Sequence, residues 1–310
     1  MFKDFFKYYK SKEPPPDFGA VIDFKKPDYS KVRNILPDVN EDEEVAQGLK
    51  PIKEWKIYEI ISKPGLIFIE NPFTTLGQQY WITRCVRDYS SKPNKTNLDL
   101  HNLFTKHENW WDECSNSAER ARTLLPKLRW ATLGYHHNWD TKEYSENAKD
   151  SMPEDMMKLT RCLAKVASFH DFKAESAIVN YYRMNSTLSG HTDHSEADCE
   201  APLFSVSFGQ TAIFLIGGLL REDPADAIFI QSGDIVIMSK SSRLRYHGVP
   251  RILAADSTPW ESESSKDITQ MKEKFSDWDR IKSYICESRV NMNVRQVLRP
   301  GQTSLDNNSP

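Results

Sequence analysis

The hydrophobic period of the chain changes near residue 175, and this change constrains the fold more than any other feature. Upstream, Met156, Leu159, Leu163 and Val166 step by three and four, which predicts a helix. Downstream, apolar residues alternate in short segments at 176–184, 203–208, 211–216, 227–231, 235–238 and 288–298, with glycine-containing turns between some of them. Helices followed by many short strands predict an α+β protein with a β-sandwich or jelly-roll core, rather than a parallel βαβ sheet.

The chain divides by pattern into four regions, at 1–54, 55–170, 171–299 and 300–310. The first carries aromatic residues at helical spacing, with lysines between them, over residues 2–9, and then a Pro-rich and acidic stretch. This pattern predicts a short helix packed on the domain, or a mitochondrial presequence, followed by an extended arm. The second region is expected to be helical, near 76–89, within 107–123 and after 151, with one strand at 66–69. The last region is expected to be a flexible tail.

Composition narrows the class of protein. The five cysteines are scattered without a CxxC pair, which disfavours a disulfide scaffold and favours a reducing compartment over secretion. No apolar run approaches the roughly 18 residues of a membrane-spanning helix. With 41 Lys+Arg against 44 Asp+Glu, the net charge is −3, so nucleic-acid binding requires a local basic patch. Candidates for such a patch are Arg84, Arg87, Lys92, Lys95, Arg120, Arg122, Lys127 and Arg129.

A possible metal site begins at His191-Thr-Asp193, which follows a strand and a Ser-Gly turn. Side chains two apart in an extended chain point the same way, so both can reach one ion. The pair alone is weak evidence, because 8 His and 44 acidic residues in 310 predict about one such pair by chance. His247 lies 54 residues beyond Asp193, after further strand segments. Two imidazoles and one carboxylate form the facial triad of non-haem Fe(II) oxygenases, although zinc accepts the same ligands.

The segment Ser288–Arg295 adds a second constellation. With period two, Arg289, Asn291, Asn293 and Arg295 share one face of a strand, and Val290, Met292 and Val294 share the other. Two arginines on an inward face are costly unless an anion binds there, and a dicarboxylate satisfies them by bidentate pairing. The alternative is an exposed sheet face with two solvated arginines. Joined to an iron-type triad, the strand favours 2-oxoglutarate as a cosubstrate.

These residues resemble a known family. The motifs of the AlkB family of Fe(II)/2-oxoglutarate dioxygenases are similar to four segments of this chain, Asn180-Tyr-Tyr182, His191-x-Asp193, His247 and Arg289-x-Asn291-x-x-x-Arg295. The sequence around these segments resembles the animal homologue 1 branch of that family over most of residues 55–298. The resemblance implies a double-stranded β-helix (jelly-roll) core with the N-terminal helices and arm outside it. It implies Fe(II) on His191, Asp193 and His247, and 2-oxoglutarate on Asn180, Tyr182, Arg289, Asn291 and Arg295. Family members use these cofactors and O₂ to hydroxylate a methyl group on a base. The hydroxylated methyl group then leaves as formaldehyde, and the base is left unmodified.

The resemblance also implies a nucleic-acid partner. Expected substrates are 1-methyladenine in tRNA and N6-methyladenine or 3-methylcytosine in unpaired DNA, with oxidation of tRNA 5-methylcytosine as a further activity. Positions that match the substrate site of this branch are Trp81, Tyr135, His136, His137 and Asn138. Trp81 also fits the apolar stripe of a helix and thus the core. The branch is found in nucleus and mitochondria, the cytoplasm also fits, and a monomer is expected.

Two departures separate this chain from the family pattern. Asn293 stands where the last strand usually carries Thr, and Ser195, followed by Glu196, stands where many members place an acid that touches the base. Base preference is therefore not transferred from other branches. Alternatives that keep part of the pattern are an oxygenase or demethylase of protein side chains such as those of histones, a nucleic-acid-binding module, and an abasic-site lyase. A lyase needs a nucleophilic amine, and the sequence singles out no lysine.

Overall fold

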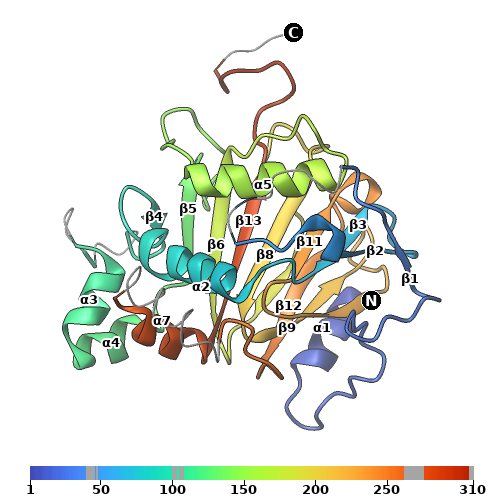
Figure 1. The fold of residues 1–310 in the computed structure, drawn as a ribbon, viewed down its shortest axis with the longest axis horizontal. Coiled ribbons are helices and arrows are strands. Elements are labelled where there is room, and N and C mark those ends of the chain that lie inside the picture. Colours follow the sequence, from blue (N-terminus) through green and yellow to red (C-terminus); the bar gives the residue numbers. More distant parts are fainter. Residues whose placement is uncertain (40–45, 47, 100–102, 105–107, 262–275, 307–310) are drawn as a thin grey trace.

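The computed structural model describes residues 1–39, 46, 48–99, 103–104, 108–261 and 276–306, so the acidic stretch 41–44 and residues 307–310 of the expected tail lie outside the described residues. Two antiparallel sheets pack face to face (Figure 1). The major sheet has nine strands in the order β1-β2-β3-β11-β8-β13-β6-β5-β4, and the minor sheet has four in the order β10-β9-β12-β7. This arrangement with flanking helices confirms the predicted α+β jelly-roll core.

The strands of the jelly roll interleave along the sequence. Those of the major sheet are β1 (Val32–Asn34), β2 (Lys56–Ile60), β3 (Leu66–Glu70), β4 (Lys95–Thr96), β5 (Trp130–Gly134), β6 (Ser176–Arg183), β8 (Leu203–Gly209), β11 (Ile235–Met238) and β13 (Ser288–Arg295). Those of the minor sheet are β7 (Leu188–His191), β9 (Thr211–Ile216), β10 (Asp226–Ile230) and β12 (His247–Leu253). Every segment that alternation predicted as a strand is one, whereas β1, β2, β4, β5, β7 and β12 were not anticipated.

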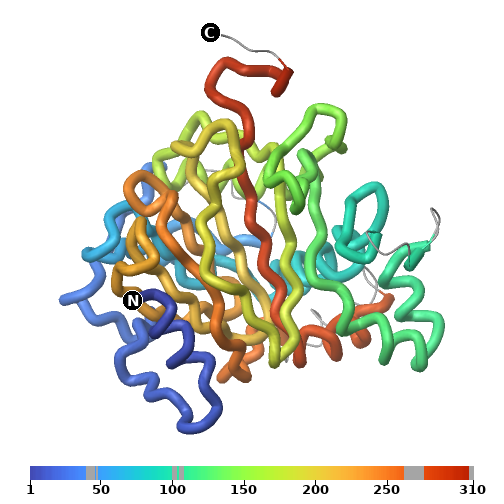
Figure 2. Tube along the Cα trace, turned by 180° about the vertical axis from the view of Figure 1, so that it is seen from behind, coloured from blue at the N-terminus to red at the C-terminus, as the bar shows by residue number. Residues whose placement is uncertain are grey.

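The helices lie on the outer surfaces of the sandwich. They are α1 (Phe2–Lys10), α2 (Thr75–Thr83), α3 (Trp110–Asn116), α4 (Ala118–Leu124), α5 (Glu154–Val166) and α7 (Trp278–Ile285), together with short helical turns at Ile52–Glu54, Arg84–Asp88 and Lys240–Ser242. In Figure 1, α2 and α5 cross the major sheet on one side. Seen from behind in Figure 2, the blue N-terminal segment lies on the other side, where α1 contacts β7, β9 and β12 of the minor sheet.

The two faces of strand β13 show how the core creates a site. Val290, Met292 and Val294 belong to the main hydrophobic core under the helices. Since side chains alternate along a strand, the intervening Arg289 and Arg295 point between the sheets. The space between the sheets is apolar toward β1–β3 and β10, where one hydrophobic cluster joins both sheets. Toward β6, β8 and β13 the space is polar.

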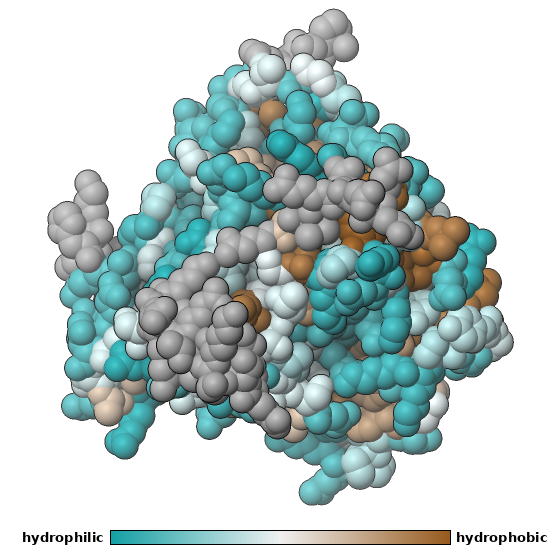
Figure 3. Space-filling model, in the orientation of Figure 1, coloured by the Kyte–Doolittle hydropathy of each residue, from teal (hydrophilic) through white to brown (hydrophobic). Residues whose placement is uncertain are grey.

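The outside of the molecule is mostly polar. The face in Figure 3 is largely hydrophilic, with hydrophobic atoms gathered in a few areas. Among the described helices, none combines the length and apolar character needed to cross a membrane.

Candidate active site

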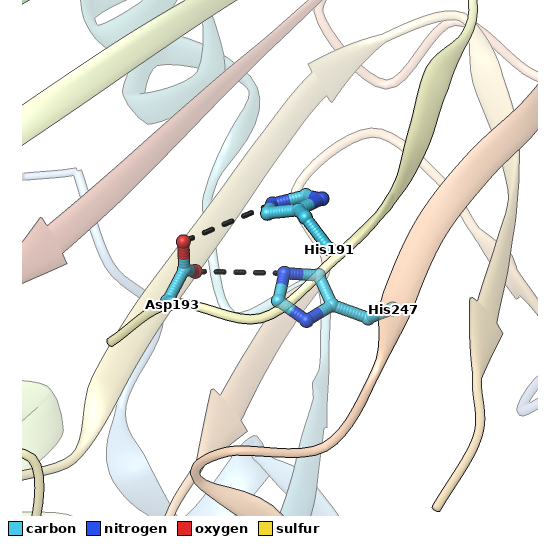
Figure 4. A group of neighbouring side chains, drawn as sticks. All are labelled: His191, Asp193 and His247. Atoms are coloured by element: carbon cyan, nitrogen blue, oxygen red, sulfur yellow. Dashed lines mark ion pairs between the residues drawn. The ribbon is translucent and has the colours of Figure 1, made fainter. Parts of the chain in front are cut away.

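The His-Asp-His cluster lies at one end of the minor sheet. His191 ends β7 and His247 begins β12, and the two residues are paired across these antiparallel strands. Asp193 follows two residues after His191, and one potential ligand atom from each side chain lies within 4.8 Å of the others. The Asp193 carboxylate oxygens are 3.8 Å from His191 Nε2 and 3.5 Å from His247 Nε2 (Figure 4). The fold therefore brings the three residues to one point from two places in the chain.

Backbone contacts set the orientation of both imidazoles. His191 Nδ1 is 2.9 Å from the Ser189 carbonyl, and His247 Nδ1 is 3.0 Å from the Arg245 carbonyl. A carbonyl only accepts hydrogen bonds, so each Nδ1 carries the proton and each Nε2 presents a lone pair to the centre. Burial lowers the pKa of His191 to about 4, which keeps it neutral at pH 7. Two neutral imidazoles and a carboxylate are a donor set that divalent iron accepts.

Arg295 keeps the Asp193 carboxylate ionised. Burial raises the pKa of Asp193, but the Arg295 guanidinium and the neighbouring His247 outweigh burial and hold that pKa well below its usual range. Arg295 Nη2 lies 3.0 Å from Asp193 Oδ1, and its Nε lies 3.5 Å from Glu196 Oε1. Its Nη1 donates to the Tyr144 hydroxyl at 3.3 Å. Arg295 is thus compensated by two carboxylates within the fold.

Arg243 fixes the loop that carries Asp193. Its side chain is 3% exposed, and it pairs with the fully buried side chain of Glu196 at 3.0 Å. It also donates to the backbone carbonyls of Asp193 at 2.7 Å and Ala201 at 2.8 Å. The sequence analysis noted Glu196 only as a departure and did not find Arg243, because neither residue lies on a strand whose period could have revealed its direction.

Arg289 lies at the other end of β13, and its surroundings differ. It is 3% exposed and faces Tyr182 of β6 in register. Its Nη2 donates to Ser207 Oγ at 2.7 Å, whereas its buried Nε and Nη1 have no hydrogen-bond partner among the described residues. Asn291 Nδ2 donates to the hydroxyls of Ser205 and Ser207 at 2.8 and 3.2 Å, and Asn180 is its register partner on β6. Burial lowers the pKa of Arg289 to about 10, so this group is still a buried cation at neutral pH. The arrangement suits a small anion.

Four of the five expected substrate residues make contacts of a structural kind. Trp81 of α2 is 1% exposed within the main core. The Tyr135 hydroxyl donates to Glu146 at 2.5 Å, and the two His136 ring nitrogens lie 2.8 Å from Thr132 and Asp150. Asn138 accepts hydrogen bonds from two backbone amides of the following turn. Their part in substrate binding stays a prediction.

His137 is the expected substrate residue that joins the metal end of the pocket. Its Nε2 lies 3.1 Å from Ser195 Oγ, and its ring meets Trp139 at 4.7 Å and Tyr144 at 5.4 Å between centroids. Burial, followed by the Arg295 charge, lowers the pKa of His137 to about 4. Trp139 in turn lies 5.0 Å from Trp130, so a group of aromatic rings extends outward from the site.

Several basic residues of the expected patch are neutralised by carboxylates. Arg84 pairs with Asp155 and Asp88 at 2.7 Å, and Arg87 pairs with Asp88 and Asp277. Lys92 pairs with Asp99, and Arg120 with Glu113. The cationic groups of these four residues therefore support the fold more directly than they supply a free phosphate-binding surface.

A jelly roll with a His-Asp-His cluster at one end and buried arginines between its sheets is typical of non-haem Fe(II) oxygenases. The chain matches the 2OG-Fe(II) oxygenase superfamily over residues 65–295. It is 39% identical over 329 residues to the mouse protein "Nucleic acid dioxygenase ALKBH1", covering 97% of this chain and 85% of the mouse protein. It is 32% identical over 293 residues to "tRNA demethylase abh1" of Schizosaccharomyces pombe, covering 87% and 92% of the two chains.

The fold is also similar to that of a solved structure. A solved structure titled "The structure of OsALKBH1" superposes with a TM-score of 0.50 at 19% identity, over 76% of this chain and 97% of that chain. The chain belongs to the AlkB family of the 2OG-Fe(II) oxygenase superfamily, which confirms the resemblance inferred from its motifs. Members of this superfamily use Fe(II) and 2-oxoglutarate.

Proposed function

We propose that the protein is an Fe(II)- and 2-oxoglutarate-dependent demethylase of methylated bases in nucleic acids. His191, Asp193 and His247 would hold the iron. The observation that carries this assignment is the convergence of their ligand atoms within 4.8 Å, with both Nε2 lone pairs directed to the same point. When bound, iron and 2-oxoglutarate with O₂ supply the oxidising power that hydroxylates a methyl group.

The polar inner face of β13 would hold 2-oxoglutarate. Arg289 would pair with the distal carboxylate through the Nε and Nη1 atoms that have no described partner. Asn291, with Asn180 and Tyr182 on β6, would complete the walls of this cradle. Arg295 would act mainly on Asp193, whose carboxylate it holds ionised and in place.

The substrate class is proposed from the relatives, one called a nucleic acid dioxygenase and another a tRNA demethylase. Methylated bases in tRNA or unpaired DNA suit a site of this kind, because a base must leave its stack to reach a buried metal. The rings of His137, Trp139 and Tyr144 lie where such a base could stack.

Purified protein supplied with Fe(II), ascorbate and 2-oxoglutarate tests the proposal. The substrates are tRNA and single-stranded, bulged and duplex DNA with defined methyl groups, read by nucleoside mass spectrometry and by succinate formation. Asp193→Ala is the inactive control, and His194→Gln replaces an exposed histidine one residue away. We expect methyl loss that requires 2-oxoglutarate and Asp193 and that survives His194→Gln.

Two other outcomes of this experiment would contradict separate parts of the proposal. Succinate formation without methyl loss from any nucleic acid would keep the iron chemistry and redirect the substrate to protein side chains. Methyl loss by Asp193→Ala at the wild-type rate would overturn the assigned metal site.

A further inference from the structure

The turn between β9 and β10 exposes two neighbouring leucines. Leu219 is 60% and Leu220 is 62% exposed in the segment Gly217–Ala225. Large apolar side chains exposed side by side commonly mark a binding surface. Leu36, which is 87% exposed on the N-terminal arm, shows that exposure of a single leucine also occurs elsewhere in this chain.

Hydrogen bonds hold this turn at its base. Gly217 N donates to the Tyr246 carbonyl at 2.7 Å, and Tyr246 N donates to the Gly218 carbonyl at 2.8 Å. Leu220 N donates to the Asp223 carboxylate at 3.0 Å, and Arg221 Nε donates to the Tyr246 hydroxyl at 2.8 Å. The leucines are therefore presented by an ordered turn, and their display costs little further ordering when a partner binds.

The turn also lies beside the metal cluster. Ile216, the last residue of β9, is the register partner of His247, and His247 is the register partner of His191. The leucines begin three residues after Ile216. A group inserted into a nucleic acid from this turn would act close to the base that enters the site.

Positive charge borders the turn. Arg221 lines a hollow of about 380 Å³ together with Lys3, Lys7 and Lys10 of α1 and with the residues just before His191. No ion pair joins these three lysines to a carboxylate in the described part of the chain, in contrast to Arg84 and Arg87. The carboxylates on the same helix and turn are Asp4, Glu222 and Asp223, so the four cations Lys3, Lys7, Lys10 and Arg221 outnumber them by one. A polyanion fits this setting better than an apolar protein face does.

We propose that Leu219 and Leu220 form an apolar wedge that enters a nucleic-acid stack and fills the space left by the base drawn into the site. This inference rests on the proposed function and extends it to base extrusion. Apolar side chains inserted between bases offset the loss of stacking. The wedge should therefore matter most where the methylated base is stacked and least where it is already free.

The test uses full-length protein with Leu219→Ser/Leu220→Ser, the volume-conserving Leu219→Met/Leu220→Met, and Leu36→Ser as the matched control. The DNA probes carry one N6-methyladenine in a single strand, a bulge or a duplex. Parallel probes carry 2-aminopurine at the same position, so that its fluorescence reports unstacking without any chemistry. We expect the double serine variant to lose about tenfold in the 2-aminopurine response and in turnover on bulged and duplex probes, and to match wild type on the single strand. The methionine and Leu36 variants should match wild type throughout.

Three results would overturn the wedge. These are an equal loss on all probes, no loss on any probe, and a loss of binding to anionic phosphatidylserine vesicles with unchanged base unstacking, which would assign the leucines to a membrane surface. Absence of turnover by wild type on every nucleic acid would instead count against the proposed function, and the fluorescence response would still judge the wedge.

Discussion

The two ends of strand β13 carry the same residue type in opposite electrostatic situations. Arg289 and Arg295 share one strand face and are almost equally buried, at 3% and 5% exposure. Arg295 lies against the carboxylates of Asp193 and Glu196, and its interactions raise its pKa above the ordinary arginine value. Arg289 makes one described side-chain hydrogen bond, to Ser207, and burial lowers its pKa to about 10.

This difference separates a cation that completes the fold from one that is available to a ligand. A buried charge is costly unless it is paired. At Arg295 the protein itself supplies the partners, and the arginine fixes a metal-ligating carboxylate in return. At Arg289 no carboxylate of the described residues forms an ion pair with the guanidinium, and Asp234 stabilises the cation only through the field of its charge. A bound carboxylate can offset the cost of burial that remains. Substitution at each end should therefore have opposite consequences for stability and for ligand binding.

The largest expected effect is on stability at the Arg295 end. Arg295→Met leaves the buried Asp193 carboxylate without its arginine partner, whereas Glu196 keeps its ion pair with Arg243. Breaking a buried pair in this way costs about 3–5 kcal/mol. The free energy of unfolding, measured by urea denaturation without metal, should fall by this amount, whereas Arg289→Met should change it little. Equal losses in both variants would contradict the comparison.

The next effect is on cosubstrate binding at the Arg289 end. Arg289→Met should raise the KM for 2-oxoglutarate by about a hundredfold, because a paired carboxylate–guanidinium contact is lost in a buried site. In wild type, 2-oxoglutarate with Mn(II) at about 100 times Kd should stabilise the fold by about 2.7 kcal/mol, and thermal unfolding of the Met variant should show no such shift. Stabilisation of the variant to the wild-type extent would place the distal carboxylate elsewhere.

The sequence predicted the core elements whose period is clean. The strands β6, β8, β9, β10, β11 and β13 and the helices α1, α2 and α5 lie where alternation or three-four spacing indicated them. The minor-sheet strands β7 and β12 were missed because each carries a metal-site histidine and a glycine, which interrupt an apolar pattern. The single helix expected within 107–123 is two short helices, α3 and α4, the second of which ends at Leu124. Helix α7 was not anticipated, and it follows a polar stretch of which residues 262–275 lie outside the described part.

Local sequence pattern also predicted only part of the candidate active site. The alternation of side chains along the strand placed Arg289 and Arg295 on one face. It could not distinguish their roles, because alternation carries no information about which side chains face each arginine. The distinction depends on Asp193, Glu196 and Tyr144, which come from loops whose directions follow from tertiary packing. Arg243 holds that loop through the Asp193 and Ala201 carbonyls and through Glu196. No local pattern could reveal it, for the same reason.

The smallest expected effect concerns the titration of His137, which lies at the Arg295 end. Its folded pKa of about 4 is below the roughly 6.5 of an unfolded histidine. The unfolded chain thus binds more protons between these values, so the contribution of His137 to stability is present above pH 6.5 and is lost as the pH falls toward 4. Arg295→Met removes a charge that opposes protonation, so the pKa of His137 should rise and its share of the acid loss should shrink. Arg289→Met should leave the titration unchanged. NMR of ¹³C-labelled histidine, assigned with His137→Gln, measures both, and equal shifts in the two arginine variants would mean that the two ends of β13 are not electrostatically distinct.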